Sequence, residues 1–454
     1  MGCEVSSTCL DKVSRFHRFR WVYCQLEALR HCLPPSVGRI LEELPETLDE
    51  TYERVLREIN KANREHAHRL LQCLTVALRP LRVEELAEVL AIDFDAPAQG
   101  GIPQLNPNWR WADHHQAVLS TCSSLIAIVD DGDSKVVQFS HFSVKEYLTS
   151  DRLASSRGDV SQYHIVLEPA HTILAQACLG VLLRLDDRVN KGNVGDIPLV
   201  EYAAQYWVDH AQFEKVASRI RDAMNYFFDA DKPHWAPWCR VQMIDFRRLD
   251  FDPTRSQDAF PLYYASLGGF YDLAEQLVGK HPEHINARGG EMETPLVAAL
   301  CRKHFEVAEL LHRNGADVDV RDKVNDTLLC EACRARVPDL VQWLLNHGAD
   351  ANVQDCPNWP PLVIAASYGP LEDVQMLIEH NADIHARNRY GRTPLHAAAS
   401  PESHRDQVDI IPVLLDHGAI LDAEDNEGKT PLQLALEKGY DDIVTCLKER
   451  GATR

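Results

Sequence analysis

Ser140, His141 and Ser143 are the residues whose types and spacing most readily suggest catalysis. A hydroxyl beside an imidazole can act as a nucleophile with its general base. Such a pair also needs an orienting carboxylate and an oxyanion hole, and nothing in the sequence places either beside these residues. We therefore interpret His141 as a structural histidine and predict that the chain is not an enzyme.

The segment Gly428-Lys429-Thr430 has the residues that end a phosphate-binding loop. That motif requires another glycine five residues before the first of these, because the backbone must bend around the phosphates. This position is Ala423, and the sequence contains no complete motif elsewhere. We therefore predict no bound nucleotide and no other cofactor.

Cysteines and histidines could bind metal, but their spacing argues against it. Cys330 and Cys333 form a CxxC pair, and no second pair stands at the spacing of a zinc site. Four histidines recur near the ends of predicted helices, where a ring N–H can donate to the last carbonyl groups: His312, His347, His380 and His417. We predict no metal site.

A repeat organises the elements in the second half of the chain. Six leucines stand 33 or 34 residues apart, with a last interval of 37: Leu262, Leu296, Leu329, Leu362, Leu395 and Leu432. An alanine follows each of them by three residues and a second leucine by fifteen, except in the fifth repeat, where 400–403 is the predicted insertion. A Gly-Ala or Asn-Ala pair follows each second leucine by four residues, whereas the first repeat has His281-Pro282.

This register predicts pairs of short stacked helices. A leucine and an alanine three residues apart lie on one helix face, and glycine or asparagine tolerates the left-handed conformation that ends a helix. One such unit cannot bury its own apolar face, so the units must stack. The segments Gly391–His396 and Gly428–Leu432 resemble the ankyrin TPLH signature. Residues 258–454 are therefore predicted to be six ankyrin repeats, with the CxxC pair inside a helix of the third.

The first half has a different order of elements. Apolar periodicity predicts helices over 66–78, 83–91 and 112–119. Two predicted strands follow, 125–129 and 135–139, joined by a turn rich in aspartate. Three helices followed by a hairpin are the order of a winged helix, in which we take 83–91 as the candidate recognition helix.

Several segments resemble one protein family. They are Arg20–Glu27, Leu44–Tyr52, Arg79–Leu86, Phe139–Leu148 and Pro198–Ala211. They are similar to the region that follows the ATPase in NACHT-type signalling proteins of fungi with carboxy-terminal ankyrin repeats. The resemblance implies a winged helix like that of inositol-deacylase-like proteins, then a helical linker, then the repeats. The ATPase motifs of the family are not found in this sequence, so its ATP-driven switching is not expected.

The predicted fold is mainly α, an ankyrin-repeat solenoid preceded by a winged-helix domain and a helical linker. The predicted parts are a flexible tail at 1–20, a helical segment at 21–63, a winged-helix domain at 64–157, a helical linker at 165–257 and the six repeats at 258–454.

Charge argues against nucleic acid as a partner. The formal net charge is −21, and residues 258–454 hold 18 Lys and Arg against 32 Asp and Glu. Glu84, Glu85 and Glu88 lie on the candidate recognition helix, where carboxylates would repel phosphate. The sequence also contains no run of eighteen apolar residues, so we predict no membrane-spanning segment and a cytoplasmic location.

The first residues fit a lipidation pattern. Met1-Gly2-Cys3-Glu4-Val5-Ser6 matches the motif for acylation of Gly2, and Cys3 offers a second site. An acylated amino terminus would give weak membrane anchoring. The alternative interpretation is a chance match to a short motif.

The predicted binding surface follows the turn before each first repeat helix. Packing positions are committed to the core, so the turn tips are the part of a solenoid that is free to vary. The candidate residues are Lys323, Asn325, Asp326, Asn358, Trp359, Tyr390, Arg392, Asn426 and Lys429. The function predicted from these observations is a protein-interaction scaffold. The alternative is a regulatory subunit whose winged helix docks on an ATPase carried by a separate chain.

Overall fold

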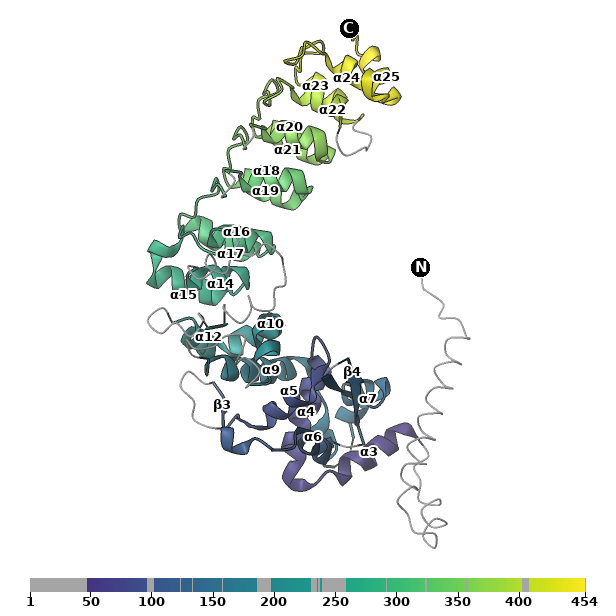
Figure 1. Cartoon of the computed structure of the whole chain (residues 1–454), viewed down its shortest axis with the longest axis vertical. Coiled ribbons are helices and arrows are strands. Elements are labelled where there is room, and N and C mark those ends of the chain that lie inside the picture. Colours follow the sequence, from purple (N-terminus) through teal and green to yellow (C-terminus); the bar gives the residue numbers. More distant parts are fainter. Residues whose placement is uncertain are drawn as a thin grey trace. The chain divides into compact units, whose positions relative to one another are not determined.

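The computed structural model describes residues 47–95, 102–122, 124–132, 134–156, 158–185, 197–229, 235, 237–238, 259–290, 292–322, 325–355, 358–401 and 408–453. The chain divides into two compact units, residues 1–253 and 254–454, and each is described by itself (Figure 1). The predicted tail at 1–20, with Gly2 and Cys3, and most of the segment 21–63 lie outside the described residues.

The first unit contains helices and two small sheets. Its α-helices are α3 (Leu48–Glu58), α4 (Arg64–Val76), α5 (Val83–Leu90), α6 (His114–Cys122), α7 (Phe142–Leu148), α8 (Asp151–Ala154), α9 (Leu167–Leu182), α10 (Val200–Ala211), α11 (Val216–Arg219) and α12 (Arg221–Phe227). Its strands are β1 (Leu81–Arg82), β2 (Ile92–Asp93), β3 (Gln104–Leu105), β4 (Ile126–Asp131) and β5 (Ser134–Phe139), with 3₁₀ turns η2 (Lys61–Asn63), η4 (Pro107–Trp109) and η5 (Ser161–Tyr163).

The expected winged-helix order is present in α4, β1, α5, α6, β4 and β5. The three strands form an antiparallel sheet in the order β1-β5-β4, with Leu81 opposite Val137. The predicted boundaries of the three helices and the hairpin differ by only a few residues from those of α4, α5, α6, β4 and β5. The choice of recognition helix was wrong, because the second helix of the helix-turn-helix, directly before the hairpin, is α6. That helix carries no Lys or Arg.

Two of the three glutamates of α5, Glu85 and Glu88, have a different role from the one predicted, whereas Glu84 is only partly buried. Glu85 is fully buried and accepts two hydrogen bonds from the Arg79 guanidinium, at 2.8 and 2.6 Å. Glu88 is 2 % exposed and pairs with Arg110. Both carboxylates therefore point into the domain, because a buried charge must be paired, and they present no repulsive face to a ligand.

Helices α9 and α10 pack against this domain within the same unit. The Arg82 guanidinium bridges Glu85 to Glu201 of α10, at 2.6 Å from the latter. The Leu78 N–H donates to the Tyr202 hydroxyl at 3.1 Å. Motif residues at 79–86 and 198–211 therefore join the winged helix to the helical segment after it.

The second unit is a series of helix pairs. Its α-helices are α14 (Pro261–Leu267), α15 (Tyr271–Lys280), α16 (Pro295–Cys301), α17 (Phe305–Arg313), α18 (Leu328–Ala335), α19 (Pro338–Asn346), α20 (Pro361–Tyr368), α21 (Leu371–Glu379), α22 (Pro394–Ala399), α23 (Ile410–Asp416), α24 (Pro431–Lys438) and α25 (Asp441–Glu449). A 3₁₀ turn, η7 (Pro282–His284), follows α15. First helices of neighbouring pairs pack on each other in four places: α14 on α16, α18 on α20, α20 on α22, and α22 on α24.

The predicted register is confirmed by burial and by helix ends. The first and second leucines of every repeat, and the alanine three residues after each first leucine, are all at most 7 % exposed. From the second to the last repeat, the second residue after the second helix is left-handed, as in Gly315 at φ +95° and Asn381 at φ +62°. The next alanine then donates its N–H to the carbonyl of the second leucine, as Ala382 does to Leu377 at 2.9 Å. This is the six-to-one bond of a Schellman motif.

Among the described residues, none of the helices has both the length and the apolar character needed to cross a bilayer.

Candidate functional site

The turn tips of four successive repeats share one internal hydrogen-bond pattern. We define the turn tips as residues 322–326, 355–359, 388–392 and 425–429. The first residue of each, an Asp or Asn, accepts a backbone N–H four residues later through its own side chain, at 2.6–3.1 Å. This bond braces the described residues of each tip, and a braced loop loses less entropy on binding.

Arginine side chains connect neighbouring tips. Arg321 donates to the carbonyl of Asn325 in its own tip and to that of Gln354 in the next repeat, both at 2.9 Å. Arg387 makes the same two contacts, to Gly391 at 2.8 Å and to Glu424 at 2.9 Å. These arginines link the first tip to the second and the third to the fourth, and we call the row of four tips the ladder.

Two aromatic rings from adjacent tips meet on this ladder. The rings of Trp359 and Tyr390 are 6.5 Å apart and nearly perpendicular, at 88°. Trp359 also lies 6.5 Å from the ring of Tyr368 on α20. Tyr390 is nevertheless 44 % exposed. A large aromatic side chain that is both oriented and accessible is a typical anchor of a protein interface.

Two guanidinium groups surround Tyr390. Arg389 lies 4.7 Å from its ring centre and Arg392 5.7 Å, both within cation–π range. Arg392 is also 3.4 Å from the buried carboxylate of Asp425. Arg389 was missed by the sequence analysis, although its position between Asn388 and Tyr390 in the tip could have indicated it. Trp359, Arg389, Tyr390 and Arg392 are named here the aromatic–arginine patch.

The other predicted residues contribute mainly to the ladder itself. Asp326 is only 8 % exposed and pairs with Arg334 at 2.8 Å. Asn426 donates its backbone N–H to the Tyr390 carbonyl at 3.0 Å, and Lys429 pairs with Glu437 at 2.8 Å.

Asn325 and Asn358 have left-handed backbones, with φ of +64° and +63°, at exposed positions of their tips. Lys323 lies outside the described residues.

His396 of the signature segment holds the helix start and the next tip together. Burial lowers the pKa of His396, so the neutral imidazole is favoured. Its Nδ1 accepts the Thr393 N–H at 3.2 Å, and its Nε2 lies 3.1 Å from the Lys429 carbonyl oxygen. This histidine is a structural residue and not a base awaiting a substrate.

Ser140, His141 and Ser143 also have structural contacts. His141 is the N-cap residue of α7, and its Nδ1 accepts the Ser143 N–H at 3.2 Å. The Ser143 hydroxyl lies 2.8 Å from that of Tyr52 on α3. His141 therefore caps α7, and Ser143 attaches α7 to α3.

The remaining cysteine and histidine candidates fit the repeats. Cys330 and Cys333 are fully buried on α18, and burial raises the pKa of Cys330 to about 12. Three of the four helix-end histidines donate from Nδ1 to the carbonyl four residues earlier: His347, His380 and His417, at 2.6, 2.9 and 2.8 Å. His312 differs, since its Nδ1 has no hydrogen-bond partner among the described residues.

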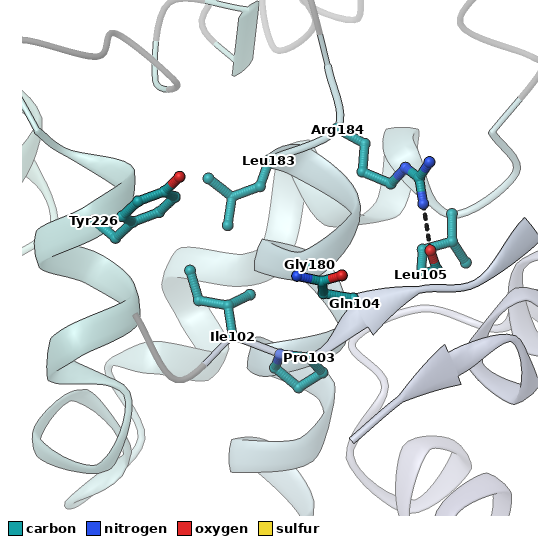
Figure 2. Close-up of a pocket in the computed structure, with 8 residues that line it drawn as sticks. All are labelled: Ile102, Pro103, Gln104, Leu105, Gly180, Leu183, Arg184 and Tyr226. Carbon is teal, nitrogen blue, oxygen red and sulfur yellow. Dashed lines mark hydrogen bonds between the residues drawn. The ribbon is translucent and has the colours of Figure 1, made fainter. Parts of the chain in front are cut away.

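A cavity of about 270 Å³ lies between α9, α12 and the segment before β3. Figure 2 shows its lining, with Tyr226 and Leu183 on one side and Arg184, which donates to the Leu105 carbonyl, on the other. Among the described residues that line it, none is a Ser, Cys, His, Asp or Glu. Gly180 lets the helix approach this loop, because a Cβ there would stand 2.5 Å from the Pro103 carbonyl oxygen.

A second hollow, of about 650 Å³, is lined by residues of α4, α5, α6 and the loop at 108–111. Trp109 and Trp111 on its rim are 45 % and 49 % exposed. Arg110 between them is held by Glu88. The hollow thus has two exposed indole rings on a fixed loop.

Comparison with protein families agrees with the geometry of both units. The model for ankyrin repeats matches three times, at residues 262–355, 296–388 and 362–453. Residues 262–453 are ankyrin repeats. The model described as the winged helix domain of GPI inositol-deacylase matches residues 52–158. The ankyrin-repeat fold is typically non-catalytic and suggests a role in protein–protein interaction.

Two curated relatives show how far the similarity extends. The "Azaphilone pigments biosynthesis cluster protein L" of Monascus ruber is 30% identical over 299 residues, which are 61% of this chain and 61% of that protein. Alpha-latrocrustotoxin-Lt1a of Latrodectus tredecimguttatus is 38% identical over 65 residues, 14% of this chain and 5% of the toxin. The chain therefore spans less than two thirds of the length of each relative.

Two solved ankyrin-repeat structures also resemble the chain. An ankyrin repeat domain from Acinetobacter baumannii AYE has 29% identity and a TM-score of 0.39, and covers 42% of this chain and 98% of its own. A second ankyrin repeat protein has 26% identity and a TM-score of 0.38, over 41% and 96% of the two chains.

Proposed function

We propose that the chain is a non-catalytic scaffold that binds a protein partner through its ankyrin turn tips. The observation that supports this most directly is the aromatic–arginine patch. Trp, Tyr and Arg are the residues that most often dominate the binding energy of interfaces. Here they converge on two adjacent tips whose backbones are already held in place.

The chemistry of the patch favours an anionic segment of a partner. Arg389 is exposed, and only one of the two guanidinium groups over Tyr390 pairs with a carboxylate, Asp425, among the described contacts. The rest of the repeats is acidic, with 32 Asp and Glu against 18 Lys and Arg at 258–454. An acidic segment with an apolar side chain would be attracted to this patch and repelled by the surface around it.

The test begins with partner capture by the full chain, followed by titration of variants. Trp359→Ala, Tyr390→Ala and Arg389→Ala should each weaken binding by about 1–4 kcal/mol. Arg392→Ala should weaken it as well, with some loss of stability because the buried Asp425 loses its ion pair. Tyr271→Ala is the matched control, since Tyr271 is 39 % exposed on α15 and distant in sequence from the patch. Unchanged affinity in all four folded variants would exclude this surface.

A second candidate function rests on the winged helix. We propose, as the alternative, that the chain is a NACHT-related signalling protein whose winged helix docks on an ATPase carried by a separate chain. The exposed Trp109 and Trp111 line one hollow and favour a docking role for this domain, because exposed apolar side chains that gather in one place mark interaction sites. Co-purification of an ATPase that is lost in Trp109→Ala and kept in Tyr390→Ala would favour it over the first candidate.

The cytoplasmic location, the absence of nucleic-acid partners and the acylation of Gly2 and Cys3 stay predictions. Acylation would be detected as membrane partition of the wild type that Gly2→Ala abolishes. Equal partition of the two proteins would exclude it.

A further inference from the structure

His281, Glu283 and His284 form a cluster of three potential metal ligands at the end of α15. Nδ1 of His281 lies 3.3 Å from Oε1 of Glu283, and Nε2 of His284 lies 3.9 Å from the same oxygen. One ligand atom from each residue lies within 4.8 Å of the others. Ligand atoms around tetrahedral zinc, with bonds of about 2.0–2.1 Å, stand about 3.3 Å apart, so small side-chain rotations suffice to bring all three onto one ion.

The backbone holds the three side chains on one turn. Pro282 opens the 3₁₀ turn η7, and the His284 N–H donates to the His281 carbonyl at 3.0 Å. The ring of Phe260 stacks on that of His284 with centroids 4.0 Å apart. Ile285, directly after the turn, is 9 % exposed and anchors it to the core. The turn therefore keeps the three side chains close together before an ion arrives, while Glu283 remains accessible from solvent.

This cluster stands where the first repeat departs from all the others. The later repeats end the second helix with a left-handed Gly or Asn, and the next alanine donates its N–H to the second leucine. Pro282 takes the alanine position in the first repeat and has no N–H to donate. Two imidazoles and a carboxylate are thus concentrated within four residues where, alone among the second helices of the six described repeats, this closing bond is missing.

We propose that His281, Glu283 and His284 bind a divalent transition-metal ion, and that zinc is the best match. Two imidazole nitrogens and one carboxylate oxygen are a ligand set that suits zinc, whereas calcium and magnesium prefer oxygen ligands alone. Three protein ligands leave a fourth position for water. The ion would connect the end of α15 to η7 and so close the first repeat. This inference does not depend on the proposed partner surface.

The test is zinc titration of the reduced full chain in competition with a chromophoric chelator. Wild type should bind one more equivalent of zinc than His284→Gln and His281→Gln. Loss of one ligand should weaken this site at least about tenfold, since loss of an outer-shell partner alone costs about 10–100-fold. The control is His417→Gln, because His417 caps α23 and lies outside the cluster. The His417→Gln variant should bind as much zinc as wild type. It shows whether loss of a histidine outside the cluster changes the titration, since other histidines and thiols can also take up zinc.

A second readout separates a site from a folding defect. Zinc should raise the midpoint of thermal unfolding of wild type and of His417→Gln more than that of Glu283→Gln. Glu283→Gln keeps both imidazoles, and its side chain is 62 % exposed, so this variant should fold. Magnesium should change none of the midpoints. Titrations of folded Glu283→Gln and His281→Gln that are the same as wild type would overturn the proposal.

Discussion

Asp373 is a buried carboxylic acid in the fourth repeat. It lies in the first turn of α21, is fully buried, and neither carboxyl oxygen has a hydrogen-bond partner among the described residues. Burial, and then the neighbouring Glu372, raise its pKa to about 7. The fold therefore favours the neutral carboxyl of Asp373, and loss of its proton destabilises the folded state.

The sign of the resulting pH dependence follows from the raised pKa. In the unfolded chain the carboxyl loses its proton near its ordinary pKa of about 4, and in the fold only near about 7. The folded protein binds the proton more tightly between these values, so the stability of the repeats should fall as pH rises from about 4 to about 7. In Asp373→Asn this part of the decline should disappear.

The measurement is the denaturant midpoint of wild type and Asp373→Asn at a series of pH values. Asp339→Asn is the control, because Asp339 is exposed on α19. Parallel pH profiles for wild type and Asp373→Asn would show that this carboxyl does not titrate with folding.

At the scale of elements, the turn-tip ladder depends on glycine at two matched positions. Gly391 and Gly428 occupy the same place in successive tips and have φ of +73° and +74°. A Cβ at Gly391 would stand 2.2 Å from Oδ1 of Asn426 and 2.9 Å from its backbone nitrogen, whereas nothing lies within 4 Å at Gly428. Both positions need the left-handed conformation, but only Gly391 also needs a residue without a Cβ atom.

We therefore predict different costs for the same substitution. Gly428→Ala should destabilise the fold by about 1–2 kcal/mol, which is the cost of a left-handed alanine. Gly391→Ala should cost more, because the next tip must also move away from the new methyl group. Chemical denaturation of both variants measures the difference. Equal losses would mean that the contact between the tips is looser than the structure indicates.

The packing layer of the repeats yields a second prediction at this scale. Leu362 of α20 is 1 % exposed, and α20 contacts both α18 and α22. Leu362→Ala should cost about 2–5 kcal/mol, because it removes apolar contacts and leaves a cavity. The exposed Leu436, at 53 %, supplies the control variant Leu436→Ala. A loss below about 0.5 kcal/mol for Leu362→Ala would mean that the register is misplaced, since surface substitutions fall in that range.

At the scale of the molecule, the repeats form a compact unit of their own. Residues 254–454 separate from 1–253, and each repeat contacts mainly its neighbours. We predict that a fragment of residues 254–454 folds alone, because the stability of a solenoid is close to a sum over repeats and their interfaces. Far-ultraviolet circular dichroism and cooperative unfolding of the fragment are the measurements. A fragment that lacks helical signal would show that the first unit is required for folding.

Local spacing was enough to determine the repeats. The positions of Leu262 and its five equivalents predict helices, packing faces and helix ends. This works because the same residue types occupy the packing positions and the helix ends in each repeat. The helices and hairpin of the winged helix were likewise predictable from apolar periodicity. Their boundaries shift by only a few residues in the structure, as for the predicted helix 66–78, which is α4 (Arg64–Val76).

Only the tertiary structure decided which way polar side chains point and what they meet. Glu85 turns inward because Arg79 reaches it, and Asp326 is buried because Arg334 reaches it from the following helix. The contact between Trp359 and Tyr390 joins two repeats. Sequence spacing reports periodicity along one element, whereas burial and charge pairing depend on neighbours that another part of the chain supplies. The helices and packing positions of the repeats could therefore be predicted from the sequence. The burial and the pairing of their polar side chains could not.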